Sequence, residues 1–225
     1  MKPKQAVQKP KNAEERKRRL GLILRRLNQR FPNVECALRH RSAWELLAAT
    51  ILSAQCTDER VNMVTAKLFE KYPAVHDIAA AGQEELEVEI RSTGFFRNKA
   101  KSLIGAANKI VAKHGGEVPA TMEELLELPG VARKTANVVL GTWFGKATGV
   151  VVDTHVHRIA NRLDLTKEQD PVKIEKDLMK ILPRKRWILF SHQIIHFGRE
   201  ICDARRPRCF VCNLQELCYS KDKTV

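Results

Sequence analysis

The sequence predicts an all-α protein. Apolar residues recur at helical spacing along most of the chain, as they do between Leu20 and Leu27, and this period indicates helices that each bury one face. Helix-end signals separate these segments: Thr121 with Glu124 forms a capping box, and Gly115-Gly116 is a C-terminal stop. No segment shows the period of two that a half-buried strand requires.

The helices can be placed in chain order from these patterns and their caps. Proline and glycine end several of them, and a favoured N-cap residue such as Thr57, Asp58 or Asp170 begins others. Residues 94–100 are expected to form a loop that leads into a long helix. The expected helices begin at Leu20, cover 44–56, run from the Thr57 or Asp58 cap to Pro73, and then cover 74–80, 84–92, about 101–114, 122–127, a segment after Gly130, 154–163, 171–182 and 187–201.

Composition indicates a globular protein whose partner is a polyanion. The chain has 225 residues, a hydrophobic content of 44% and a formal net charge of +14, with an isoelectric point near 9.7. This charge favours nucleic acid over membrane, and no apolar run approaches the ~20 residues that span a bilayer. The N-terminus shows no secretory signal, and the cysteine pattern suggests metal ligation in a reducing compartment. If the source is bacterial, we expect the cytoplasm, at the nucleoid.

Residues 1–19 are predicted to form a flexible basic arm. Lysine and arginine dominate the segment, opposed only by Glu14 and Glu15. The arm has almost nothing apolar to bury, so it has no reason to fold alone. It would either add sequence-independent affinity for DNA or be a solvated tail.

The stretch 128–153 carries the residues with the clearest chemistry. Pro129-Gly130 predicts a turn, because proline presets φ and glycine accepts a positive φ. A helical apolar period follows, so the turn precedes a helix N-terminus, where amide groups and the dipole can bind a phosphate. Lys134 lies in the first turn of that helix, where the positive dipole end disfavours the protonated amine, so it can act as a nucleophile. Asp153 precedes the next helix and is a favoured N-cap.

Four cysteines near the C-terminus form a candidate metal site. Four thiolates in so short a loop suit either Zn²⁺ or a [4Fe–4S] cluster, and their spacing alone does not choose. Arg205, Arg206 and Arg208 lie within the loop, so a bound metal would order a basic segment for phosphate contact. Cys36 and Cys56 lie outside the set and are expected to be buried as small hydrophobes. The spacing C-x6-C-x2-C-x5-C is made by Cys202, Cys209, Cys212 and Cys218.

Two motifs give the chain a family resemblance. Leu-Pro-Gly-Val-x-Arg-Lys-Thr-Ala from Leu128 and Val-Asp-Thr-His from Val152 resemble those of the helix-hairpin-helix DNA glycosylases of the endonuclease III family. The resemblance extends from about residue 20 to 219. It implies a bifunctional DNA N-glycosylase and AP lyase of base excision repair that excises oxidised pyrimidines. It makes Lys134 the catalytic nucleophile and Asp153 the essential carboxylate, and it favours a [4Fe–4S] cluster on the four cysteines.

The resemblance also implies the domain organisation. A six-helix domain is expected over residues 36–146, with the helix-hairpin-helix at about 122–145. Residues 20–35 and 147–225 are expected to pack together as the cluster-bearing domain, with the active cleft between the two domains. We expect a monomer that binds double-stranded DNA containing damaged pyrimidines or abasic sites.

Several residues are expected to contact the DNA. By resemblance, Gln55 fills the hole left by an extruded nucleotide, although local capping would also explain it. Phe95 and Phe96 follow a glycine and could wedge between base steps; family members often carry an aliphatic residue and a tyrosine there. Ala132 replaces a glycine usual in the hairpin, and alanine tolerates a positive φ poorly. The full set is Gln55, Phe95, Phe96, Gly130, Ala132, Arg133, His155, Arg205, Arg206 and Arg208.

Other functions fit the sequence less well. His192 and His196 are one helical turn apart, as in zinc proteases, but Gln193 stands where the catalytic glutamate is required. A monofunctional glycosylase would not need Lys134. A non-catalytic, cluster-stapled DNA-binding module would require Lys134 and Asp153 to match the family by accident.

Overall fold

The computed structural model describes residues 9–224, and this part of the chain is helical without any β-strand. The predicted all-α class is therefore confirmed. The chain divides into two compact units. The terminal unit contains the chain up to Glu35 and from Gly149 onward, and the central unit is Cys36–Thr148. No helix within residues 9–224 is long and apolar enough to cross a membrane.

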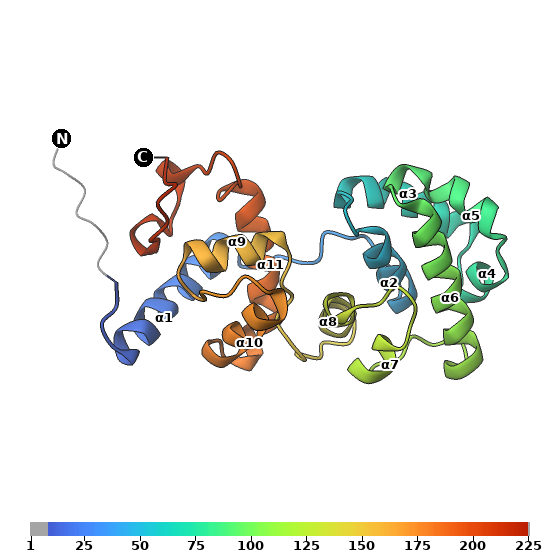
Figure 1. Ribbon diagram of the computed structural model, residues 1–225, viewed down its shortest axis with the longest axis horizontal. Helices are drawn as coiled ribbons and strands as arrows, with labels where there is room; N and C mark the ends of the chain where they lie inside the picture. Colours follow the sequence, from blue (N-terminus) through green and yellow to red (C-terminus); the bar gives the residue numbers. More distant parts are fainter. Residues whose placement is uncertain (1–8, 225) are drawn as a thin grey trace. The chain divides into compact units, whose positions relative to one another are not determined.

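The central unit is an array of seven α-helices and one 3₁₀ helix, η1, among the described residues (Figure 1). Its elements are α2 Ala43–Leu52, α3 Asp58–Lys71, α4 Val75–Ala80, α5 Gln83–Ile90, η1 Arg91–Thr93, α6 Phe96–His114, α7 Met122–Leu126 and α8 Arg133–Thr142. Helix α2 forms the centre of this unit, because every residue from Trp44 to Leu52 is buried. A helix that is apolar on all sides must be enclosed by others, and α3, α6 and α8 pack against it.

The terminal unit joins the two ends of the chain around a second core (Figure 1). Its elements within residues 9–224 are α1 Ala13–Arg30, α9 Thr154–Arg162, α10 Pro171–Ile181, η2 Arg184–Arg186, α11 Trp187–Glu200, η3 Cys209–Val211 and η4 Gln215–Leu217. Ile23 and Leu27 of α1 and Phe190 and Phe197 of α11 are fully buried in this core. These apolar residues recur at helical spacing, and their burial in one core holds the N-terminal and C-terminal segments together.

The prediction of an arm over residues 1–19 is wrong for its second half. Asn12 caps α1 by accepting a hydrogen bond from Glu15 N, so the helix begins at Ala13 rather than near Leu20. Arg19 is tied to distant segments: its guanidinium donates to the carbonyls of Leu163 and Leu217 and lies 4.4 Å from the centre of the Tyr219 ring. Residues 1–8 lie outside the described part of the chain.

Two helix ends also differ from the prediction, and both bear on the site. Helix α2 ends at Leu52, not Cys56, so Gln55 lies in a turn beyond the helix. Helix α6 already begins at Phe96, within the expected loop 94–100. The local apolar period continues past Leu52, so it could not reveal where the backbone leaves the helix.

Candidate functional site

The hairpin between α7 and α8 contains a glycine turn just before the N-terminus of α8. Gly130 has φ of +75°, which the Pro129-Gly130 pair predicts. Ala132 is the N-cap of α8, with φ −98° and ψ 171°. This is extended backbone that alanine adopts without strain, so alanine fits where a glycine was expected. No side chain caps α8, and an uncapped N-terminus favours an anion.

Replacing Gly130 by alanine should destabilise the hairpin. A Cβ at Gly130 would lie 2.6 Å from Ser102 Cβ, and the positive φ adds strain. We expect a loss of about 1–3 kcal/mol in urea unfolding. Gly145→Ala is the matched control, because Gly145 has φ of +64° but no atom within 4 Å of its added Cβ. Equal losses in both variants would show that Ser102 contact contributes nothing.

Lys134 is exposed in the first turn of α8. The helix behind it is firmly held, because Ala136, Val139 and Leu140 are fully buried. Arg133 is half-buried beside it. The amine of Lys134 is thus presented to solvent from a rigid helix, next to the turn that suits a phosphate.

Gln55 and Phe95 share an unusual backbone. Both are non-glycine residues in the left-handed region, with φ of 53° and 49°, and both are exposed, Phe95 by 64% of its surface. Left-handed conformations cost energy for such residues, and they occur often at binding sites. Exposed side chains that project from strained turns of a rigid helical unit are suited to insert into a bound partner molecule.

Phe96 differs from Phe95. It is half-buried and packs against the core of the central unit. Its ring also lies 5.9 Å from the Arg91 guanidinium and 5.7 Å from that of Arg97. Phe96 is therefore a packing residue, and only Phe95 is free of the core as a wedge would need to be.

Asp153 caps α9 in the terminal unit, as predicted. Its Oδ1 accepts a hydrogen bond from Val156 N at 2.8 Å, and the carboxylate is only half-buried. His155 lies two residues further on, where Arg158 Nη2 is 3.1 Å from His155 Nδ1. Arg158 also donates to the Cys202 carbonyl at 2.9 Å, so the helix that Asp153 caps is fixed to the first cysteine of the C-terminal loop.

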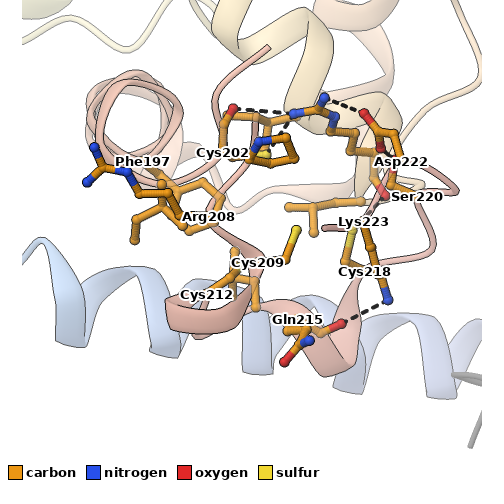
Figure 2. A pocket seen from close by; sticks show the side chains of 16 residues that line it. Phe197, Cys202, Arg208, Cys209, Cys212, Gln215, Cys218, Ser220, Asp222 and Lys223 are labelled. Carbon is orange, nitrogen blue, oxygen red and sulfur yellow. Dashed lines mark hydrogen bonds and ion pairs between the residues drawn. The ribbon is translucent and has the colours of Figure 1, made fainter. Parts of the chain in front are cut away.

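The four cysteines line one cavity of the terminal unit (Figure 2). All four thiols are free and half-buried. Burial raises the pKa of Cys212 to about 11 and also raises that of Cys202, which Arg162 opposes. Arg162 Nη1 donates to Cys202 Sγ at 3.2 Å. Within residues 9–224, however, no three histidine, cysteine or acidic side chains are placed to hold a metal ion together.

The arginines of the cysteine loop point their charge outward. Arg205, Arg206 and Arg208 are exposed, while their backbone is held: Asp203 Oδ1 accepts from Arg205 N and Arg206 N at 2.8 and 2.9 Å. Arg208 N donates to the Ile201 carbonyl at 2.8 Å. A fixed backbone that bears three solvated guanidinium groups suits contact with phosphates.

His192 and His196 are packing residues, as expected. The His196 ring lies 6.3 Å from the Phe31 ring, and its Nε2 is 3.3 Å from the Glu35 carbonyl oxygen. Burial and the proximity of His196 lower the pKa of His192. Gln193 is fully buried and donates to the Phe31 carbonyl at 2.9 Å.

The structure also contains two hydrogen-bonded cations that the sequence does not predict. Lys99 is a buried lysine whose Nζ donates to two backbone carbonyls. Arg162 joins α9 to the cysteine loop through the carbonyls of Cys202, Asp203 and Ala204. In a chain with 40 lysine and arginine residues, no local signal separates these two from solvated ones.

Known proteins resemble this chain over nearly its whole length. A family model described as "HhH-GPD superfamily base excision DNA repair protein" matches residues 48–184. Endonuclease III of Synechocystis sp. is 55% identical over 205 residues, which are 91% of this chain and 94% of that protein. Endonuclease III of Bacillus subtilis is 44% identical over 207 residues, covering 92% and 94%.

Solved structures resemble the chain equally well. A non-covalent endonuclease III–DNA complex superposes with a TM-score of 0.86 at 46% identity and covers 90% of this chain and 94% of that one. A trapped endonuclease III–DNA covalent intermediate gives a TM-score of 0.86 at 45% identity, covering 90% and 95%.

Proposed function

Because the chain belongs to the endonuclease III family, within the HhH-GPD superfamily of base excision DNA repair proteins, we propose that it is a bifunctional DNA N-glycosylase and AP lyase. Its substrate is double-stranded DNA that contains oxidised pyrimidines or abasic sites. The observation that carries the assignment is the pair of motif residues: an exposed lysine at the start of α8 and a carboxylate that caps α9.

Lys134 supplies the nucleophile. Its neutral amine attacks C1′ of the damaged nucleotide, the C1′–N bond to the base breaks, and the base leaves. The C1′–O4′ bond of the sugar ring then breaks, O4′ takes up a proton, and a protonated Schiff base forms between Nζ and C1′. Removal of a C2′ proton then expels the 3′ phosphate by β-elimination, so the strand is cut. A glycosylase without this lysine would remove the base and stop.

Asp153 supplies a negative charge. Breaking the glycosidic bond develops positive charge on the sugar, and a nearby ionised carboxylate stabilises it. Asp153 lies at the N-terminus of α9. Only one of its oxygens is used in capping, through Val156 N, so the other oxygen is available to the reaction.

Gln55 and Phe95 read the distorted duplex. A glycosidic bond inside a duplex is not accessible, so the nucleotide must be flipped out, and this costs less for a damaged base. Gln55 pairs with the orphaned base opposite, and Phe95 inserts between base steps. The turn at Gly130 with the N-terminus of α8, including Ala132 and Arg133, binds a backbone phosphate. Arg205, Arg206 and Arg208 add phosphate contacts. The first turn of α9, which contains His155, adds another. If the source is bacterial, the genomic substrate implies a location at the nucleoid.

The C-terminal cavity is the proposed site of a [4Fe–4S] cluster. Four thiols line it, and Arg158 and Arg162 face Cys202 with positive charge, which suits an anionic cluster. Cys202, Cys209, Cys212 and Cys218 would hold the cluster, whose contribution is structural: it fixes the loop that presents the arginines.

A purified sample should be brown and contain iron and sulfide. Cys209→Ser should lower the iron content and weaken DNA binding before it changes the chemical step, because the arginine loop loses its support. Cys36→Ser, outside the set, is the control and should retain iron. Elemental analysis and visible absorbance measure the outcome. Zinc in place of iron in an anaerobic preparation would contradict the cluster assignment.

The overall function is tested on a duplex with one oxidised thymine. We expect release of the base and a cut strand that carries the unsaturated sugar remnant of β-elimination, both separable by gel and mass spectrometry. Base release without a cut would identify a monofunctional glycosylase. Binding without either product would identify a DNA-binding module.

A further inference from the structure

Lys99 is a buried cation in α6 of the central unit. It is only 5% exposed, and its Nζ donates to the Leu52 and Thr93 carbonyls, each at 2.8 Å. Burying an ammonium group is costly unless it is well hydrogen-bonded, and burial lowers the pKa of Lys99, partly opposed by Cys56. Here the partners are backbone carbonyls rather than a carboxylate. A lysine buried in this way indicates that its ammonium group has a specific structural role.

The two carbonyls end two different helices. Leu52 is the last residue of α2, and Thr93 is the last residue of η1. Final carbonyls of a helix lack partners within it and carry the negative end of its dipole. One ammonium satisfies both carbonyls, and it thereby ties the ends of the two helices together.

Each of these helix ends leads directly into a strained, exposed turn. Gln55 follows Leu52 by three residues, and Phe95 follows Thr93 by two. Both have left-handed backbones, and Asp164 is the one other non-glycine residue in 9–224 with a positive φ. Strained conformations persist only where their surroundings hold them. Lys99 donates to the Leu52 and Thr93 carbonyls, which lie directly before the two turns.

We propose that Lys99 is a positioning residue for damage recognition: its ammonium fixes the Gln55 turn and the Phe95 turn relative to each other, so that both side chains enter the duplex together. This inference rests on the DNA contacts proposed above for Gln55 and Phe95. Lys99 itself does not touch the substrate.

The test replaces Lys99 by methionine, which keeps the length of the side chain and removes its donors and charge. Two quantities are measured: the affinity for a duplex with a stable abasic analogue relative to an undamaged duplex, and the fluorescence of 2-aminopurine placed opposite the analogue. We expect the affinity ratio to fall about tenfold or more, and the fluorescence increase that reports an unstacked base to be lost.

Lys113→Met is the matched control. Lys113 lies on the same helix, about 21 Å from Lys99 at 1.5 Å per residue, and it is 59% exposed at the side chain. It makes a surface ion pair with Glu127, which Lys109 also pairs at 3.0 Å. This variant carries the same change in net charge and should keep both readouts.

A mutant cycle separates positioning from general stability. In a Gln55→Ala/Phe95→Ala background, Lys99→Met should cost less than about twofold more in the affinity ratio, since residues that act through one another are not additive. A further tenfold loss there would overturn the inference. If Gln55→Ala/Phe95→Ala keeps full discrimination, the proposed DNA contacts fail. If that background is impaired while Lys99→Met alone behaves as the wild type, only the positioning role fails.

Should Lys99→Met not fold, Lys99→Gln is used, because it keeps two N–H donors without the charge. Hydrogen exchange should then accelerate at the amides of residues 53–56 and 94–95 and stay unchanged within α2 and α6. Uniform acceleration across the central unit would overturn the inference.

Discussion

A Lys134→Gln protein is expected to form no covalent adduct with DNA under borohydride. With the wild type, the reagent reduces the Schiff base between Lys134 and C1′ to a stable amine, seen as a slower band on a denaturing gel. Glutamine offers no nucleophilic amine, so the band should vanish and strand cleavage should fall by about three orders of magnitude or more. The fold should not suffer, because Lys134 is exposed and surface changes of this kind alter stability by about 0.5 kcal/mol at most.

Measurements of DNA binding show whether the loss in Lys134→Gln is confined to the chemical step. Losing one phosphate-facing charge should reduce the magnitude of the negative slope of log K against log salt by about 1. It should also weaken binding equally on damaged and undamaged duplexes. Lys67→Gln, an exposed lysine of α3, is the control for charge and should keep the adduct. A persistent adduct in Lys134→Gln would assign the nucleophile to another amine. No adduct with the wild type, on an oxidised pyrimidine or an abasic site, would make Lys134 a phosphate contact.

Local chemistry made much of this molecule predictable from its sequence. Cap residues and turn glycines act within a few residues, so Thr121, Gly130, Asp153 and Asp170 occupy the structural positions that their patterns predicted. The cysteine spacing likewise led to four thiols around one cavity. In each case the physical cause lies within the motif itself.

The errors have the opposite origin. Arg19 belongs to a helix that is anchored by carbonyls more than a hundred residues away, so a local count of charges took it for part of an arm. The helix boundary before Gln55 and that before Phe96 depend on left-handed turns, and the buried ammonium of Lys99 joins the segments that lead into those turns. Tertiary contacts of this kind leave no periodic trace in the sequence.

Asp153→Asn should separate the two uses of this carboxylate. Asparagine caps a helix as well as aspartate does and can accept the bond from Val156 N, now 2.8 Å long. Stability in urea should therefore change by less than about 1 kcal/mol, the scale of a charge at a helix N-terminus. The negative charge that stabilises the developing positive sugar is lost, so single-turnover base excision should fall by roughly 10²–10³-fold, while the damaged duplex still binds.

Two further variants decide whether the loss of base excision arises in the chemical step. Asp170→Asn makes the same change at the same kind of position, because Asp170 Oδ1 accepts from Lys173 N at 3.0 Å at the start of α10; it should leave both excision and stability intact. Asp153→Ala removes charge and cap together, so it should match Asp153→Asn in excision and lose about 1 kcal/mol more in stability. If Asp153→Asn excises within about threefold of the wild type, well short of the loss expected for a missing transition-state charge, the carboxylate only caps α9 and the charge that assists bond cleavage comes from elsewhere.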